Sequence, residues 1–333
     1  MKALIQKLVE AKGPSGFETE VREIIRAEIE PLVDEINVDA LGNLIAVKGQ
    51  ADPGGKKIML AAHMDEIGLI ATHVDENGYI RFTSIGGVRR NNLIDRQVIF
   101  LNGIQGVIGQ ELLEDENRQP AFDQMFIDVG AERAADCPIR TGDVAVFDQP
   151  LKDLGDRLVS KSMDDRIGVA VLIESLRQVK RSPHQLFFVF SVQEEVGLRG
   201  ATTATFRIEP DVGIAVDVTR SGDTPKGLKM DVALGKGPAI KVRDSGMLAD
   251  PRVVDWMAKT AARHAIPCQM EVLERGTTDA RAMQLTRTGV PSGCLSIPCR
   301  YIHGPSEMVD LRDVQNAVKL LSTLLSSPIE LNA

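Results

Sequence analysis

The segment Leu186-Phe-Phe-Val-Phe-Ser-Val-Gln-Glu-Glu-Val-Gly197 joins a continuous apolar run to two adjacent carboxylates. The run from Leu186 to Val192 is typical of a buried strand. Where such a strand ends the backbone turns, so Glu194 and Glu195 can point into one cleft, one to bind a metal and the other to handle a proton. An acidic pair is also common on a solvated helix face, so the rest of the chain must decide between these interpretations.

The composition is that of an ordinary soluble globular protein. The 333 residues, 43% hydrophobic and 26% charged, suffice for two domains. A formal net charge of -8 provides no basic surface, so we expect no nucleic acid and no membrane as partner. No segment resembles a signal peptide or reaches the roughly 20 apolar residues of a membrane-spanning helix. Four dispersed cysteines without Cys-x-x-Cys spacing predict no disulfide framework and favour a cytoplasmic location.

Residues 1–68 and 159–333 have the periodicity of one discontinuous α/β domain. Ser15-Gly-Phe-Glu18 matches a capping box and predicts a helix that starts there. Apolar periodicity predicts further helices at 166–176, 251–264, 278–286 and 311–325. Short apolar runs predict strands at 36–38, 44–47, 57–62, 186–192, 212–216, 269–273 and 293–297.

Residues 69–158 have a different pattern of predicted secondary structure. Short strand candidates at 79–85, 97–101, 106–108, 125–129 and 143–147 follow one another without intervening helices. Such a run predicts a small all-β domain, a barrel or a sandwich, inserted into the α/β domain.

Side chains with metal-binding chemistry follow the predicted strands at equivalent positions. The ligand cleft of an open α/β sheet lies beyond the carboxyl ends of its strands, so residues remote in sequence should converge there. Asp164 and Asp165 instead open a predicted helix, whose N-terminus favours carboxylates. The residues that follow strands are His63, Asp65, Glu194, Glu195, Asp217 and His303.

Each of these residues also has an ordinary structural explanation. His63 could be a satisfied core histidine, and Asp164 with Asp165 could cap a helix. Asp217 could start an Asx turn, and His303 could be a plain loop residue. A shared position at one end of one sheet is better explained by a common function than by independent coincidences.

Two histidines and three carboxylates suit a pair of divalent metal ions. Nitrogen and oxygen ligands together favour zinc or cobalt, whereas magnesium prefers oxygen alone. A bridged pair about 3.5 to 4 Å apart activates water and polarises a carbonyl, while a free carboxylate accepts the proton. The sequence therefore predicts hydrolysis without a covalent intermediate, and it contains no Gly-x-Ser-x-Gly motif for a nucleophilic serine.

Five motifs together resemble the cytoplasmic glutamyl aminopeptidase and tetrahedral (TET) aminopeptidase family of dinuclear metallopeptidases. They are Ala62-His-Met-Asp-Glu-Ile-Gly68, Ser162-Met-Asp-Asp-Arg-Ile-Gly168, Gln193-Glu-Glu-Val-Gly-Leu-Arg-Gly200, Val216-Asp-Val-Thr219 and Ile302-His-Gly-Pro-Ser-Glu-Met308. The resemblance covers nearly the whole chain, including the β-rich insertion, and the motifs are highly specific as a set.

The resemblance implies a set of five metal ligands. In this family pattern His63, Asp164 and Asp217 bind one ion. Asp164, Glu195 and His303 bind the other, so Asp164 is the bridging ligand.

The same resemblance implies two further roles. Glu194 is expected to be the general base that activates the water and returns a proton to the leaving amine. Asp65 is expected to orient the ring of His63 and so to select its tautomer. Similar enzymes have a cis peptide bond at the position of Asp164 and Asp165.

The family also implies an architecture and a substrate class. The catalytic domain, residues 1–68 and 159–333, should be a zinc-peptidase-like α/β sandwich that carries the metals. The inserted domain, residues 69–158, should drive dimerisation, and dimers should assemble into a hollow tetrahedral dodecamer. The expected substrates are short peptides trimmed from a free N-terminus.

One motif departs from the family pattern, and other functions stay open. Gly276-Thr-Thr-Asp-Ala-Arg281 ends in arginine where many relatives have glycine; it could pair with an acidic substrate side chain, but a salt bridge on a helix surface is the favoured interpretation. A metal-dependent hydrolase of acyl-amino acids is the nearest rival. A glucanase would use Glu194 and Glu195, but an aromatic content of 4% leaves few sugar platforms. A non-catalytic peptide-binding scaffold is a further alternative.

Overall fold

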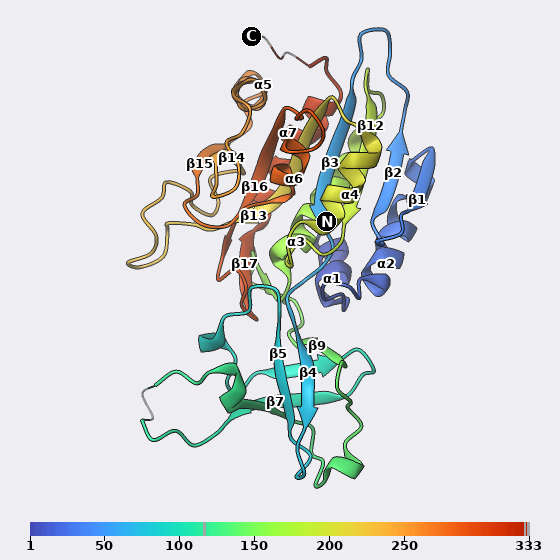
Figure 1. Ribbon diagram of the computed structural model, residues 1–333. Coiled ribbons are helices and arrows are strands. Elements are labelled where there is room, and N and C mark those ends of the chain that lie inside the picture. Colours follow the sequence, from blue (N-terminus) through green and yellow to red (C-terminus); the bar gives the residue numbers. More distant parts are fainter. Residues whose placement is uncertain (116–117, 330, 332–333) are drawn as a thin grey trace.

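The computed structural model describes residues 1–115, 118–329 and 331. Within this part of the chain, a central sheet of eleven strands adjoins a closed barrel of six (Figure 1). The strands of the sheet are β1 (Glu35–Val38), β2 (Leu44–Lys48), β3 (Lys57–His63), β10 (Lys152–Asp153), β11 (Arg157–Ser160), β12 (Gln185–Ser191), β13 (Val212–Thr219), β14 (Ala239–Arg243), β15 (Gln269–Val272), β16 (Ser292–Arg300) and β17 (Glu307–Asp310).

The centre of the sheet is parallel. Its main path runs β1-β2-β12-β3-β13-β16-β17-β11-β10, and β12, β3, β13 and β16 point the same way. Side chains of β3 alternate between the two faces, so Leu60 packs in one hydrophobic cluster and Met59 and Ala61 in another. Because both faces are covered, these strands are apolar along nearly their whole length.

Helices cover both faces of the sheet. They are α1 (Lys2–Glu10), α2 (Thr19–Ile29), α3 (Met163–Gln178), α4 (Arg199–Ile208), α5 (Pro251–Arg263), α6 (Asp279–Gln284) and α7 (Leu311–Leu325). Apolar residues of α1, α2, α3, α5 and α7 share the larger core cluster, whereas those of α4 and α6 join the cluster on the opposite face. The sheet is therefore the middle of three layers, the arrangement expected of an α/β domain.

The barrel is inserted between β3 and β10. Its strands are β4 (Gly68–Val74), β5 (Ile80–Ile85), β6 (Gln97–Phe100), β7 (Gln105–Gln110), β8 (Met125–Asp128) and β9 (Val144–Phe147). They close in the order β4-β5-β8-β7-β6-β9 around a separate apolar core that includes Ile80, Phe100 and Ile127. Figure 1 shows this barrel, in cyan and green, beyond one end of the sheet.

The predicted fold class is confirmed, with additions. An α/β sandwich with an inserted all-β barrel is what the structure has. The capping box is wrong: α2 starts at Thr19 without a side-chain cap, and Ser15 hydrogen-bonds elsewhere. The expected strands and helices occur with ends shifted by a few residues. The elements that had not been predicted include β4, β10, β11, α4, β14 and β17.

Among the described residues, every helix is too short or too polar to cross a bilayer.

Candidate metal centre

Parallel strands bring three of the predicted ligands to one edge of the sheet. His63 is the last residue of β3 and lies in register with Ser191, the last residue of β12. Glu194 and Glu195 follow β12 after two intervening residues. Asp217 lies within β13, two residues before its end, rather than after the strand as the sequence suggested.

Asp164 reaches the same place from the start of α3. The backbone of Asp164 and Asp165 is not helical, and the peptide bond between them is cis, as the family resemblance implied. The two carboxylates have different partners: Asp165 accepts a hydrogen bond from the backbone N–H of Gly168, at 3.0 Å, while Asp164 faces the histidines. The two aspartates therefore do different work despite being neighbours.

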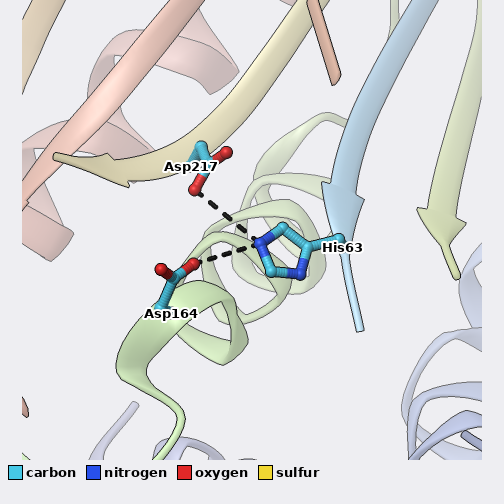
Figure 2. Close-up of side chains that lie close together, drawn as sticks. All are labelled: His63, Asp164 and Asp217. Carbon is cyan, nitrogen blue, oxygen red and sulfur yellow. Dashed lines mark hydrogen bonds and ion pairs between the residues drawn. The ribbon is translucent and has the colours of Figure 1, made fainter. Parts of the chain in front are cut away.

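The five predicted ligands form two triads that share Asp164. In the first, Nε2 of His63 lies 3.1 Å from Oδ1 of Asp164 and 3.9 Å from Oδ1 of Asp217 (Figure 2). In the second, Nε2 of His303 lies 3.3 Å from Oδ2 of Asp164 and 3.2 Å from Oε1 of Glu195. Ligand atoms within each triad lie within 4.8 Å of one another, which is close enough to surround one ion each.

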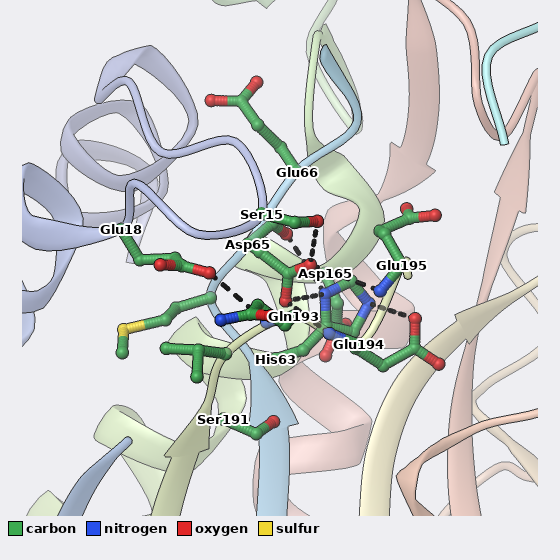
Figure 3. A network of polar contacts seen from close by, with 12 residues as sticks. Ser15, Glu18, His63, Asp65, Glu66, Asp165, Ser191, Gln193, Glu194 and Glu195 are labelled. Atoms are coloured by element: carbon green, nitrogen blue, oxygen red, sulfur yellow. Dashed lines mark hydrogen bonds and ion pairs between the residues drawn. The ribbon is translucent and has the colours of Figure 1, made fainter. Parts of the chain in front are cut away.

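Asp65 belongs to neither triad but contacts residues of the centre. Nδ1 of His63 is 3.0 Å from the backbone carbonyl oxygen of Asp65 and 3.5 Å from its carboxylate, so Nε2 is the nitrogen left to face the triad. The carboxylate accepts the backbone N–H groups of Glu194, at 2.9 Å, and Glu195, at 3.2 Å, and the hydroxyl of Ser15, at 2.6 Å (Figure 3). One buried aspartate thus links the histidine to both glutamates.

Glu307 is a supporting residue that the sequence analysis did not single out. Its carboxylate accepts the backbone N–H of Asp164, at 2.9 Å, and that of His303, at 2.7 Å. Its place in the last of the five motifs, four residues after His303, was the available signal. Glu307 therefore fixes the backbone of Asp164 and of His303, which are two of the three residues in the second triad.

The barrel supplies a wall of the site through Gly86 and Gly87. A Cβ atom on Gly87 would lie 2.6 Å from Nδ1 of His303, and one on Gly86 would lie 3.1 Å from Cβ of Glu195. Only glycine lets the backbone approach these side chains so closely. The loop after β5 is therefore packed directly against the second triad.

The charges of the centre are not balanced by its own side chains. Burial raises the pKa of Glu194 well above its usual range, and the charges of Asp217 and Glu195 add to this rise. Burial and the charge of Asp164 likewise raise the pKa of Asp217. Although burial acts in the opposite direction, Glu195 and Asp164 raise the pKa of His303 to about 11. Such an excess of buried negative charge is the electrostatic condition for binding divalent cations.

A second buried charge cluster adjoins the centre but has a different composition. Nζ of Lys161 lies 2.9 and 2.8 Å from the two carboxylate oxygens of Glu66 and 3.0 Å from the carbonyl oxygen of Ala11. The Nε–H of Arg166 donates to the carbonyl oxygen of Met64, at 2.8 Å, and its guanidinium also contacts Glu66. Here two cations surround one carboxylate.

The metal centre opens into a cleft of about 1000 Å³. His63, Asp164, Glu194 and Asp217 are among its lining residues. Arg281 also lines the cleft, and no salt bridge holds it among the described residues, contrary to the favoured interpretation. The cleft is large enough for several residues of a peptide beside the ligands.

Comparison with known proteins agrees with this geometry. Residues 42–320 match the family model described as M42 glutamyl aminopeptidase. A putative aminopeptidase of Acetivibrio thermocellus is 46% identical over 96% of both chains, and the lysyl aminopeptidase of Pyrococcus furiosus is 38% identical over 97% of this chain and 96% of its own.

A solved structure agrees as well. The TET1 peptidase of Pyrococcus horikoshii superimposes with a TM-score of 0.88 at 32% identity, over 97% of this chain and 98% of its own. The family model covers well over half of the sequence, and the relatives align along nearly its full length. The chain therefore belongs to the M42 glutamyl aminopeptidase family and is a metal-dependent aminopeptidase.

Proposed function

We propose that this aminopeptidase holds two divalent metal ions, one by His63, Asp164 and Asp217 and the other by Asp164, Glu195 and His303. The position of Asp164 carries this proposal, because Oδ1 lies 3.1 Å from the ring of His63 while Oδ2 lies 3.3 Å from the ring of His303. A carboxylate whose two oxygens face two different histidines is arranged as a bridge between two ions.

We propose zinc or cobalt as the metal. Each triad offers one imidazole nitrogen and two carboxylate oxygens, a donor set that suits these ions better than magnesium. When bound, the ions supply Lewis acidity that polarises the scissile carbonyl and acidifies a water molecule.

Glu194 is the proposed general base. Its Oε2 lies 3.9 Å from Nε2 of His63, beside the first triad but outside both ligand sets. From this position the carboxylate takes a proton from the attacking water and delivers it to the nitrogen of the leaving amine. Asp65 positions the base, because its carboxylate accepts the backbone N–H of Glu194.

We further propose the assembly and location of the enzyme. Residues 1–68 and 159–333 form the catalytic domain, and the inserted domain of residues 69–158 drives dimerisation. The TET1 relative can assemble into a tetrahedron or an octahedral shell, which supports a homo-oligomer of dimers and, in our proposal, a tetrahedral dodecamer. Short peptides with a free N-terminus are the proposed substrates, and the cytoplasm keeps the four free thiols reduced.

Metal reconstitution tests the proposal. After removal of metal with a chelator, zinc or cobalt is returned, and the bound ions per subunit are counted while hydrolysis of aminoacyl anilides is followed. We expect two ions per subunit in the active protein and one in His303→Ala. Full activity with a single ion, or two ions in the variant, would contradict the shared site. Faster cleavage of N-acylated than of free peptides would favour the acyl-amino acid hydrolase instead.

A further inference from the structure

Four consecutive backbone N–H groups hold the turn that carries the proposed base (Figure 3). Each of them donates to the side chain of a residue that is remote in sequence, so the turn is fixed residue by residue. From donor to acceptor, the bonds join Val192 to Oδ1 of Asn43 (3.0 Å), Gln193 to Oε1 of Glu18 (3.2 Å), Glu194 to Oδ1 of Asp65 (2.9 Å) and Glu195 to Oδ2 of Asp65 (3.2 Å). Glu18 therefore joins the N-terminal segment, before the first strand, to the residue next to the base.

Gln193 depends on such a contact because its backbone is left-handed. Its φ is 56°, a conformation that costs free energy in any residue other than glycine. It persists only where surrounding groups hold it. Gln193 directly precedes Glu194, whose Oε2 lies 3.9 Å from Nε2 of His63. Relaxation of the backbone at Gln193 would therefore turn the carboxylate of the base away from this position.

Glu18 is a buried carboxylate whose partners are backbone groups. The residue is 4% exposed, and its Oε1 also accepts the N–H of Gly16, at 2.7 Å. Burial raises the pKa of Glu18 to about 7, although the hydrogen bonds from Gly16 and Gln193 lower it. Within residues 1–115, 118–329 and 331, no ion pair joins this carboxylate to a cation. Two backbone N–H groups thus compensate the burial of Glu18.

These contacts explain the sequence pattern at Ser15 and Glu18, which does not cap α2. The hydroxyl of Ser15 donates to Asp65, at 2.6 Å, while the carboxylate of Glu18 accepts the N–H of Gln193. One short segment therefore contacts both the residues that follow β3 and those that follow β12.

We propose that Glu18 is a positioning residue for the reaction and acts through Glu194. Its carboxylate fixes the backbone of Gln193, and this fixes the direction in which Glu194 presents its carboxylate to the attacking water. A misplacement of about 1 Å at the reacting atoms can lower a rate by on the order of 100-fold. The inference rests on the proposed role of Glu194 as general base and names a contact that orients it.

Variants of similar side-chain length test the contact. Glu18→Met removes the acceptor and retains most of the volume, so we expect kcat for an aminoacyl anilide to fall by about 10-fold to 100-fold. KM should change by less than about threefold, because substrate binding does not depend on the direction of the base. Metal content per subunit and the thermal unfolding midpoint are measured on the same samples, and the metal content should equal that of the wild type.

Two further variants serve as rescue and control. Glu18→Gln keeps an oxygen that can accept both N–H groups, so its kcat should stay within about threefold of the wild type. Glu20→Met is the matched control, because Glu20 is an exposed glutamate of the same segment that accepts the N–H of Lys12, at 3.3 Å. It should leave kcat unchanged.

A double variant shows whether the effect passes through the base. Once Glu194→Gln has removed the proton acceptor, its orientation no longer matters. Glu18→Met should then lower the remaining kcat by less than about twofold, because two residues that act as a unit have non-additive effects. Glu18→Ala replaces Glu18→Met in both backgrounds if the methionine does not fit.

The outcomes separate this inference from the proposed mechanism. A wild-type kcat in Glu18→Met, equal losses in Glu18→Met and Glu18→Gln, or equal losses with and without Glu194 would overturn the positioning role alone. Wild-type kcat in metal-loaded Glu194→Gln would overturn the base itself, and with it the role of Glu18.

Discussion

Two buried charge clusters lie next to each other in this protein and differ in their balance. Around Glu66, one carboxylate contacts the cations Lys161 and Arg166, and these cations also donate hydrogen bonds to backbone carbonyl oxygens. Around Asp164, carboxylates outnumber the two histidines, and Oδ2 of the neighbouring Asp165 has no hydrogen-bond partner in the described part of the chain.

The two clusters have different consequences for the folded state. Buried ion pairs that are fully hydrogen-bonded hold segments together, because removing one partner leaves the other charge without compensation. Buried carboxylates that repel one another destabilise the fold until a cation binds. We therefore interpret the balanced cluster as structural and the unbalanced one as the proposed metal centre, although Asp65 and Glu66 are adjacent in sequence.

The largest expected effect comes from the unbalanced cluster. Glu194→Gln should lower kcat by about 100-fold to 10,000-fold, because the amide cannot accept the proton of the attacking water. Metal content per subunit, measured by mass spectrometry alongside peptide hydrolysis, should stay at the wild-type value.

The neighbouring glutamate is the matched comparison. Glu195→Gln weakens a proposed ligand and should release an ion as activity falls. If metal-replete Glu194→Gln retained more than about a tenth of wild-type activity, Glu194 would not be the base.

In the balanced cluster, we expect a substitution to lower the free energy of unfolding. Lys161→Met leaves the buried Glu66 without its closest cation, so we expect unfolding free energy to fall by about 3 kcal/mol. Urea unfolding followed by circular dichroism measures this change. Lys2→Met is the control, because it breaks an ion pair of the same 2.8 Å length in an exposed setting, where water screens the charges and the expected change is much smaller. Similar losses in both variants would refute the distinction.

The smallest expected effect is a change in stability whose sign depends on whether metal is bound. Asp217→Asn removes a carboxylate whose pKa is raised by burial and by Asp164, and the amide oxygen can still accept the N–H of Val218. With chelator present, we expect the variant to be more stable than the wild type by on the order of 1 kcal/mol. With zinc or cobalt present it should be less stable, because a ligand is lost. Thermal unfolding under both conditions checks this, and a loss of stability without metal would count against an unbalanced centre.

Much of the fold could be predicted because its buried strands are apolar and its turns are marked by glycine. Two of the missed elements, α4 and β14, lack a clear signal of this kind. Helix α4 contains a glycine, three threonines and an isoleucine, which have weak helix propensity, and Leu198 at its start provides no side-chain cap. Strand β14 contains Lys241, which is buried only because Glu271 neutralises it from another strand. A contact between distant segments leaves no local pattern in the sequence.

The same limit applies to the site. Ligands that follow parallel strands could be placed together, because the carboxyl ends of such strands share one edge of the sheet. The supporting role of Glu307 and the close approach of Gly87 to His303 could not be predicted from the sequence. Each depends on how two remote segments pack. The predicted ligands were thus easier to identify from the sequence than the residues that hold them in position.

The approach of Gly86 and Gly87 to the ligands also bears on how this architecture can change over evolution. The barrel has its own core and looks like a module that could be exchanged or deleted. Its loop nevertheless forms a wall of the metal centre, with no room for a Cβ atom beside His303. Replacing the barrel would therefore remake the active site, so the two parts of the molecule must be inherited, engineered and optimised together.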